Sequence, residues 1–301
     1  MQILIRMHNE VLDINNIPAL RFEHNRSVLE TDKHAGCDAL EPELRKTSKC
    51  STMASWIAWI SPELRGRIFH YLLSSRRTRN YYHRISEAGY KRLYQTVLPY
   101  ASPDVSHLSA NDVITALATV LFAQAFHKAG RIDGATDFMT NIMLDIRPRV
   151  KRLSRANYVG NALLIKEATN PLDILLQESA APQALATVAC SIRRAVNSVD
   201  ERYCNQLGYM FNNARCSYVD MLLQITKTKN TFVCTNHTRF KYYEMDFGNG
   251  VPVLVRPSFL VFENDFVIMP AHPDVGGFEL AFTTVPEVAK HIDDSKYWQF
   301  C

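Results

Sequence analysis

The sequence lacks several features that would place the protein in a specialised class. No CxxC pair occurs among its seven cysteines, and the histidines are not spaced to complete a zinc site. No apolar run approaches the roughly 18 residues that a membrane-spanning helix needs. The N-terminus shows no signal-peptide pattern. We therefore expect a cytoplasmic protein with reduced thiols, with no metal and no membrane partner.

A large excess of charge of one sign is also missing. The 34 basic and 30 acidic residues leave a formal charge of +4. Hydrophobic residues make up 47% of the chain, which is enough for one large domain or two moderate ones. Basic residues do concentrate between Arg65 and Arg92, interleaved with aromatic residues. A solvated helix face beside core aromatics explains this pattern more simply than a nucleic-acid surface, so we expect no nucleic-acid partner.

Segments that predict strands and helices alternate irregularly along the chain. Ser109 is a good N-cap, with Asp112 three residues on, for a helix that Gly130 closes. Other helices are predicted at 81–97, 182–207 and 286–291, and strands at 1–7, 67–72, 138–146, 231–233, 251–255 and 259–269. This mixture, without an internal repeat, predicts an α/β fold.

Four short motifs follow one another in the second part of the chain. They are Ser109-Ala-Asn-Asp-Val-Ile-Thr-Ala116, Asp145-Ile-Arg147 with Asn157-Tyr-Val-Gly-Asn161, Tyr243-Glu-Met-Asp246-Phe-Gly-Asn-Gly250, and Gly276-Gly-Phe-Glu279 with a closing helix through Trp298 and Phe300. In order and rough spacing they resemble motifs of the BAHD and trichothecene O-acetyltransferase superfamily. The third resembles that family's Asp-Phe-Gly-Trp-Gly signature, with Asn249 in place of Trp.

The resemblance implies a chloramphenicol-acetyltransferase-like fold of two lobes, each a mixed sheet flanked by helices. Acetyl-CoA or another acyl-CoA and the alcohol acceptor enter a channel between the lobes from opposite sides, and the family usually works as a monomer. Because the motifs cover residues 65–301, we expect the first lobe to be largely missing and the C-terminal lobe to be intact. The expected division is 1–64, a remnant of the N-terminal lobe; 65–108, a connecting strand and helix; and 109–301, the C-terminal acyltransferase lobe.

The general base implied by the resemblance belongs to a His-x-x-x-Asp motif. Its imidazole takes the proton of the acceptor hydroxyl, and its Asp supports the local backbone. Without a gap, Asp13 aligns with the motif Asp and Asn9 with the base, whereas one inserted residue makes His8 the base. The literal spacing also occurs at His34 and Asp38, in a polar, loop-like stretch. His8 with Asp13 is the first candidate, and His34 with Asp38 is the alternative.

The family's signature loop is structural and lies away from the chemistry. Here the resemblance assigns that role to Asp246, Phe247, Gly248 and Gly250. Asp246 is expected to form an ion pair or to cap the loop, and the glycines to supply left-handed positions. Thr235 and Asn236 occupy positions that line the family's channel and are expected to contact the pantetheine arm or the acceptor.

The other candidates have simpler interpretations. Gly276 and Gly277 are expected to form a turn, because no strand-to-helix phosphate loop surrounds them. Arg256 is a candidate partner for a carboxylate. His237 and six further histidines are expected to be ordinary surface or core residues: His70, His83, His107, His127, His272 and His291.

Two functions follow from these observations. The first is acyl transfer, most simply of an acetyl group, from acyl-CoA to a hydroxyl of a fungal secondary metabolite such as a terpenoid or trichothecene. That function would place the protein in mycotoxin biosynthesis. The second is a catalytically inactive, truncated homologue that binds a ligand or partner without turnover, as Asn9 at the position of the base and the short first lobe would allow.

Overall fold

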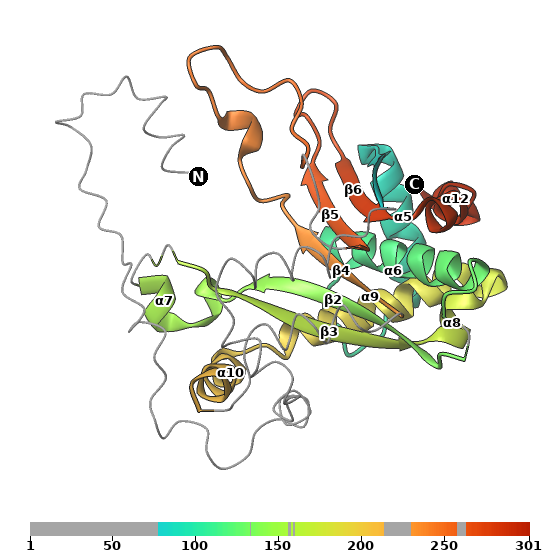
Figure 1. Ribbon diagram of the computed structural model, residues 1–301, viewed down its shortest axis with the longest axis horizontal. Helices are drawn as coiled ribbons and strands as arrows, with labels where there is room; N and C mark the ends of the chain where they lie inside the picture. The colour runs from blue at the N-terminus through green and yellow to red at the C-terminus, as the bar shows by residue number, and fades with distance from the viewer. Residues whose placement is uncertain (1–77, 133, 156–157, 159, 214–229, 258–262) are drawn as a thin grey trace.

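The computed structural model describes residues 78–132, 134–155, 158, 160–213, 230–257 and 263–301 (Figure 1). Their centre is a six-stranded sheet with the strand order β1-β6-β5-β4-β2-β3. The strands are β1 (Arg79–Ile85), β2 (Asp137–Asp145), β3 (Leu163–Pro171), β4 (Thr231–Asn236), β5 (Asp265–Pro270) and β6 (Phe278–Thr284). The predicted strands at 1–7 and 67–72 lie outside the described residues.

The sheet is mixed, with three parallel strands at its centre. β4 runs parallel to β2 on one side and to β5 on the other. β3 pairs antiparallel with β2, and β6 pairs antiparallel with both β5 and β1. The carboxyl ends of β2, β4 and β5 therefore point the same way. In open α/β sheets, such an edge commonly binds ligands.

Helices cover one face of this sheet. They are α5 (Glu87–Val97), α6 (Ala110–Lys128), α7 (Lys151–Arg155), α8 (Leu172–Leu176), α9 (Ala181–Asn197), α10 (Glu201–Asn213) and α12 (Pro286–Asp293), with the 3-10 turns η2 (Leu98–Tyr100), η3 (Arg147–Arg149), η4 (Glu178–Ala180), η5 (Tyr242–Glu244) and η6 (Lys296–Phe300). Figure 1 shows α5, α6, α9 and α12 on one side of the sheet. Side chains of these four helices share the main core with strands β2, β4, β5 and β6.

α6 is the central element of that core. It is apolar on all sides, and every residue from Asp112 to Phe126 is buried, as expected for a helix enclosed by other elements. Its Phe122 ring stacks on Phe232 of β4 at 5.0 Å between centroids and meets Phe282 of β6 edge-on at 5.6 Å. These aromatic contacts fix α6 against the strands whose ends carry the candidate site.

Two smaller clusters lie beside the main core. One packs Leu153 of α7 and Tyr203 of α10 against Leu164 of β3, on the same face of β3 as Ala168 of the main core. The other lies on the opposite face and places the partly buried Tyr242 and Val255 on buried residues of β5 and β6. The segment between β4 and β5 therefore folds back over the sheet. None of the helices within the described ranges is long and apolar enough to cross a membrane.

Several predictions of local structure are confirmed. Ser109 caps α6 with a full capping box, and Gly130 follows the helix with a φ of 65°. The strand predicted at 138–146 is β2, and the helix predicted at 286–291 lies within α12. The mixed α/β class is also confirmed.

Two predicted helices have wrong boundaries. The predicted helix at 81–97 is strand β1 followed by α5, which begins after Ser86 because that hydroxyl accepts a hydrogen bond from Gly89 N. The long helix at 182–207 is two helices. Arg149 donates to the carbonyls of Val196 and Val199 where α9 ends, and Asp200 accepts from Tyr203 N where α10 begins.

The predicted strand at 251–255 is a loop. Its Val253 side chain is 86% exposed, and Val255 N donates to the Tyr243 hydroxyl instead of to a neighbouring strand. The strand predicted at 259–269 starts only at Asp265, after Asn264 in a left-handed conformation (φ 67°), while 258–262 lie outside the described residues. The alternating valines do not form a strand here, because a strand also needs a neighbouring strand with which its backbone can form hydrogen bonds.

Candidate functional site

Polar side chains follow β4 at the edge where the parallel strands end. Phe232 and Cys234 of β4 belong to the core shared with α6. Because side chains alternate along a strand, Asn236 points to the same face as these two and Thr235 to the opposite face. His237 extends the pairing by one step, since its amide donates to Ile268 O of β5 at 2.8 Å.

Asn236 joins the end of β4 to the first turn of α6. Its amide nitrogen donates to Asn111 Oδ1 at 2.7 Å. Its Oδ1 accepts from the backbone amide and hydroxyl of Thr238 at 2.8 and 2.6 Å. The three side chains are half-buried. Asn236 therefore stabilises the turn after β4 and holds the end of β4 against the first turn of α6.

The start of α6 is held by a buried ion pair. Asp112 Oδ2 accepts from the amide and hydroxyl of Ser109 at 2.6 and 2.8 Å. Arg193 of α9 donates to the same oxygen from Nε at 2.8 Å and to Ser109 Oγ at 2.7 Å. Asp112 is fully buried. The Ser-x-Asn-Asp motif thus has two tasks: Ser109 and Asp112 cap the helix, and Asn111 binds Asn236.

A second arginine joins the two halves of the second motif. Arg147 donates from Nη1 to Asp145 Oδ1 at 2.8 Å and from Nε to the carbonyl of Tyr158 at 2.9 Å. It also donates to the carbonyl of Gly160. A Cβ on Gly160 would lie 2.0 Å from the Tyr158 hydroxyl, so only glycine fits there. These residues form a structural clamp between β2 and β3.

His237 carries the imidazole nearest in sequence to the end of β4. Its Nδ1 lies 3.0 Å from the Tyr242 hydroxyl, and its ring packs beside Phe240 at 4.8 Å between centroids. Burial lowers the pKa of His237, and burial raises the pKa of Tyr242. Both groups are therefore neutral near pH 7.

The side chain of Asp246 forms hydrogen bonds within its own loop. Its Oδ1 accepts from Gly248 N at 2.7 Å and from Gly250 N at 3.0 Å. Both glycines have left-handed φ angles, 97° and 91°, which side-chain-bearing residues rarely adopt. Phe247, between Asp246 and Gly248, is 68% exposed. This geometry is that of a loop-capping carboxylate.

The far end of the same loop is anchored to the sheet. Arg256 pairs with Glu279 at 3.0 Å and lies over the Tyr82 ring at 4.7 Å, and the Tyr82 hydroxyl donates to Pro257 O at 3.0 Å. Arg256 therefore has a carboxylate partner, which is Glu279. The loop from Asp246 to Pro257 is built from these contacts at its two ends.

Comparison with known proteins identifies this architecture. A family model described as the Transferase family matches residues 104–297. This chain belongs to that family, the BAHD acyltransferases. A search of curated proteins gives no match.

Solved structures with the BAHD fold match the chain at low sequence identity. TRI101 of F. sporotrichioides, complexed with coenzyme A and T-2, is 18% identical with a TM-score of 0.62, over 80% of this chain and 53% of that one. TRI101 of F. graminearum, complexed with coenzyme A and deoxynivalenol, is 16% identical with a TM-score of 0.62, over 87% and 60%. TRI3 trichothecene 15-O-acetyltransferase of F. sporotrichioides is 15% identical with a TM-score of 0.50, over 87% and 53%. At these identities the matches establish the fold. The chain spans little more than half the length of these structures.

Within the BAHD frame, the described residues bring some predicted site residues together and leave others apart. Asn236 meets Asn111 of α6, and Asp246 binds its own loop glycines. The two candidate pairs for the base, His8 with Asp13 and His34 with Asp38, lie outside the described residues. The predicted boundaries of the three parts of the chain, after residues 64 and 108, stay predictions. Sequence reasoning missed the pairing of His237 with Tyr242, although the two lie only five residues apart.

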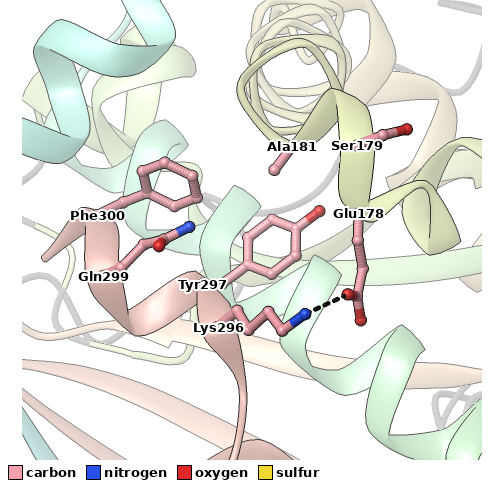
Figure 2. A pocket seen from close by; sticks show the side chains of 7 residues that line it. All are labelled: Glu178, Ser179, Ala181, Lys296, Tyr297, Gln299 and Phe300. Atoms are coloured by element: carbon pink, nitrogen blue, oxygen red, sulfur yellow. Dashed lines mark hydrogen bonds and ion pairs between the residues drawn. The ribbon is translucent and has the colours of Figure 1, made fainter.

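A separate hollow of about 280 Å³ lies between the start of α9 and η6 (Figure 2). It is lined by Glu178, Ser179, Ala181, Lys296, Tyr297, Gln299 and Phe300. Glu178 pairs with Lys128 at 3.3 Å and with Lys296 at 3.5 Å. These two cations lower the pKa of Glu178, and Lys128 has the larger effect. The pairs are exposed and contribute little to stability. Within the described part of the chain, no group of three or more His, Cys, Asp or Glu side chains could hold a metal ion.

Proposed function

We propose that this chain is an acyl-CoA-dependent O-acyltransferase that acylates, most simply acetylates, a hydroxyl of a small fungal secondary metabolite such as a trichothecene. Family membership carries the proposal, because the matched residues 104–297 include both Asn111 and Asn236 at the candidate site. The solved relatives support the choice of reactants, since they were complexed with coenzyme A and T-2 or with coenzyme A and deoxynivalenol.

The reaction joins two small molecules at one site. The acceptor hydroxyl attacks the thioester carbonyl of acyl-CoA once a base removes its proton, and coenzyme A leaves as a thiol. Acyl-CoA is the co-substrate, no metal takes part, and a monomer suffices. Thr235 and Asn236, at the carboxyl end of β4, are proposed to border the channel that holds the reactants. The resemblance puts the base at His8, supported by Asp13, or at His34 with Asp38.

A second candidate function is binding without turnover. Asn9 stands at the position of the base in an ungapped alignment with the family motif, and an amide cannot accept a proton at neutral pH. The chain also spans only 53 to 60% of the length of the three solved relatives. A protein of this kind would bind coenzyme A and release no thiol.

Thermal unfolding with and without acetyl-CoA tests coenzyme binding, and release of free thiol tests transfer. We expect one cooperative transition whose midpoint rises with saturating acetyl-CoA, because a ligand that binds only the folded state stabilises it. We also expect thiol release that requires an alcohol such as deoxynivalenol. ATP at the same concentration controls for general polyanion binding. A raised midpoint without thiol release from any of a panel of terpenoid alcohols favours binding without turnover. An unchanged midpoint contradicts both functions.

A further inference from the structure

The hollow between the start of α9 and η6 brings together three groups that can bind an anion (Figure 2). They are the first turn of α9, the hydroxyl of Tyr297 and the ammonium group of Lys296. We propose that this hollow binds a small monocarboxylate, a molecule with one carboxylate group and a short apolar body. The proposal goes beyond acyl transfer and does not depend on it.

The hollow lies at the opposite end of α6 from the candidate site. Lys128, the last residue of α6, pairs at 3.3 Å with Glu178, which lines the hollow. Asn111, in the first turn of the same helix, binds Asn236 of β4. α6 has 19 residues, so its two ends are roughly 28 Å apart at 1.5 Å per residue. The hollow is therefore a separate site.

Tyr297 supplies a buried hydroxyl that lacks an acceptor. The side chain is 2% exposed, and its hydroxyl has no hydrogen-bond partner among the residues that the structure describes. Gln124 of α6 lies near it, but Gln124 Nε2 is a donor and already binds the Leu175 carbonyl at 3.0 Å. Burial raises the pKa of Tyr297, so the hydroxyl keeps its hydrogen at neutral pH. A ligand oxygen at this point would satisfy a group that is costly to leave unpaired.

The first turn of α9 adds a positive electrostatic potential. α9 has 17 residues and begins after Ala180, and no side chain in the described part of the chain caps its first amides. Its first turn carries no acidic residue. The start of such a helix attracts negative charge through its dipole and its unbonded amides. Figure 2 shows the Tyr297 hydroxyl turned toward the segment of Glu178 and Ala181, which leads into this turn. The hydroxyl and the helix end therefore favour an anion at the same place.

The charged side chains at the rim favour one negative charge over two. Glu178 accepts from Lys128 at 3.3 Å and from Lys296 at 3.5 Å. Both cations, and Lys128 more strongly, lower the pKa of Glu178, so this carboxylate is ionised at neutral pH. Two cations beside one carboxylate leave a single positive charge in excess. A monocarboxylate balances that charge, whereas a phosphate dianion would exceed it and be repelled by Glu178.

The size of the hollow and its remaining walls favour a short apolar body. Its volume of about 280 Å³ lies just below the roughly 300 to 1,000 Å³ of sites that hold drug-sized molecules. Ala181 and the rings of Tyr297 and Phe300 line it, and the two rings lie 5.9 Å apart between centroids. A short aliphatic chain gains from contact with these apolar groups. Butyrate has both the single charge and such a chain.

A ligand reaches the hydroxyl past exposed side chains at the mouth. The Lys296 side chain is 80% exposed, and Gln299 is exposed as well. Exposed side chains change rotamer in picoseconds to nanoseconds, and such changes commonly accompany binding. Lys296 can leave Glu178 for the ligand carboxylate, because an exposed ion pair contributes little to stability.

Titration calorimetry and saturation-transfer NMR with sodium butyrate test the site on the full chain. For so small a ligand we expect a dissociation constant on the order of 1 mM. Butyramide has the same shape without the charge, and inorganic phosphate at equal ionic strength has a second charge. Both should bind at least about tenfold more weakly than butyrate, since a hydrogen bond to a charged group is stronger than one to a neutral group.

Three variants locate the binding. Tyr297→Phe keeps the ring and removes only the hydroxyl, so it should weaken butyrate binding by at least about tenfold. Lys296→Gln should weaken it by about two- to fivefold, because that ammonium group is exposed. Lys290→Gln removes an exposed lysine of α12 and should leave butyrate binding unchanged.

Thermal unfolding of Tyr297→Phe without butyrate gives a second readout. Because the hydroxyl has no partner, its removal should leave the midpoint unchanged or raise it. Tyr100→Phe, at a residue that is 50% exposed, is the control. A midpoint lowered in Tyr297→Phe alone would show that the fold already satisfies the hydroxyl, and the proposal would fail.

The binding data decide the rest. No butyrate binding by the unaltered protein, or equal binding by folded Tyr297→Phe, overturns the site. Tighter binding of phosphate or butyramide than of butyrate overturns the choice of a monocarboxylate. If Tyr297→Phe does not fold, the difference between butyrate and butyramide and the effect of Lys296→Gln decide. Acyl transfer is measured separately by thiol release, so either proposal can fail without the other.

Discussion

Arg193 Nε lies 2.8 Å from Asp112 Oδ2, so a cation on α9 neutralises the carboxylate that caps α6. Asp112 is fully buried, and the Arg193 side chain is only 13% exposed. The next residue, Arg194, donates from Nε to Asp104 Oδ2 at a similar distance of 2.7 Å, but both of those side chains are about half exposed. One helix thus carries a buried and an exposed ion pair side by side.

The buried pair should matter far more for stability. Asp112→Ala leaves Arg193 buried without its partner, and Ser109 loses its reciprocal cap. We expect the free energy of unfolding to fall by about 3–5 kcal/mol, measured by urea titration. Asp104→Ala is the matched control and should barely move the midpoint, because its pair is solvent-exposed. Equal effects of the two variants would refute this account of α6.

Asp246 should stabilise the fold without taking part in coenzyme A binding. Asp246→Ala removes two hydrogen bonds to a carboxylate, those from Gly248 N and Gly250 N. We expect a loss of about 1–3 kcal/mol in the free energy of unfolding, with the dissociation constant for coenzyme A unchanged. Thermal unfolding and equilibrium binding measure the two quantities. An unchanged melting temperature with loss of thiol release would instead place Asp246 in the chemistry.

Local capping was predictable from the sequence, and distant partners were not. The cap of α6 could be predicted because Ser109 and Asp112 lie three residues apart. Arg193 lies 81 residues from Asp112, and nothing in the intervening sequence indicates which of the many basic residues completes the pair. The start of β1 was missed for the same reason, because its partner is β6 near the other end of the chain.

The motifs indicated the family but not how their residues contact one another. Arg147 and Tyr158 belong to two separate segments of the second motif, and only the fold shows that Arg147 Nε donates to the carbonyl of Tyr158 at 2.9 Å. His237 and Tyr242 are close in sequence, but their contact depends on two turns that composition does not specify. An isolated histidine after a strand is usually an ordinary surface or core residue, so the pattern alone gave no reason to expect this contact.

Gly277 tests the close approach of a turn to β1. Both Gly276 and Gly277 have positive φ angles, and a Cβ on Gly277 would lie 2.2 Å from Ile85 O. Gly277→Ala should therefore lower the free energy of unfolding by well over the roughly 1 kcal/mol that a left-handed alanine costs. Gly134→Ala is the control, since Gly134 has a φ of 77° and no atom within 4 Å of its Cβ position. Urea unfolding of both variants separates steric clash from backbone strain, and equal losses would contradict the clash.

His237 should make stability depend on pH in a defined direction. Its folded pKa lies below the value of about 6.5 for an unfolded chain, so at acidic pH the folded state binds fewer protons than the unfolded chain does. The stability that comes from burying the neutral ring is fully present above about pH 6.5, and it is lost as the pH falls through the folded pKa. His237→Gln has no such group. The difference in unfolding free energy between the unaltered protein and this variant should therefore shrink from pH 7.5 to pH 5.5.

Urea titrations at half-unit steps of pH measure that difference directly. His127→Gln, which removes an exposed imidazole, is the control for loss of a histidine as such. Parallel stability profiles for His237→Gln and the unaltered protein would mean that the ring has the same proton affinity folded and unfolded. The half-buried imidazole with a lowered pKa, as described for His237, would then be wrong. This measurement needs no acceptor alcohol, so it can be made before the substrate is known.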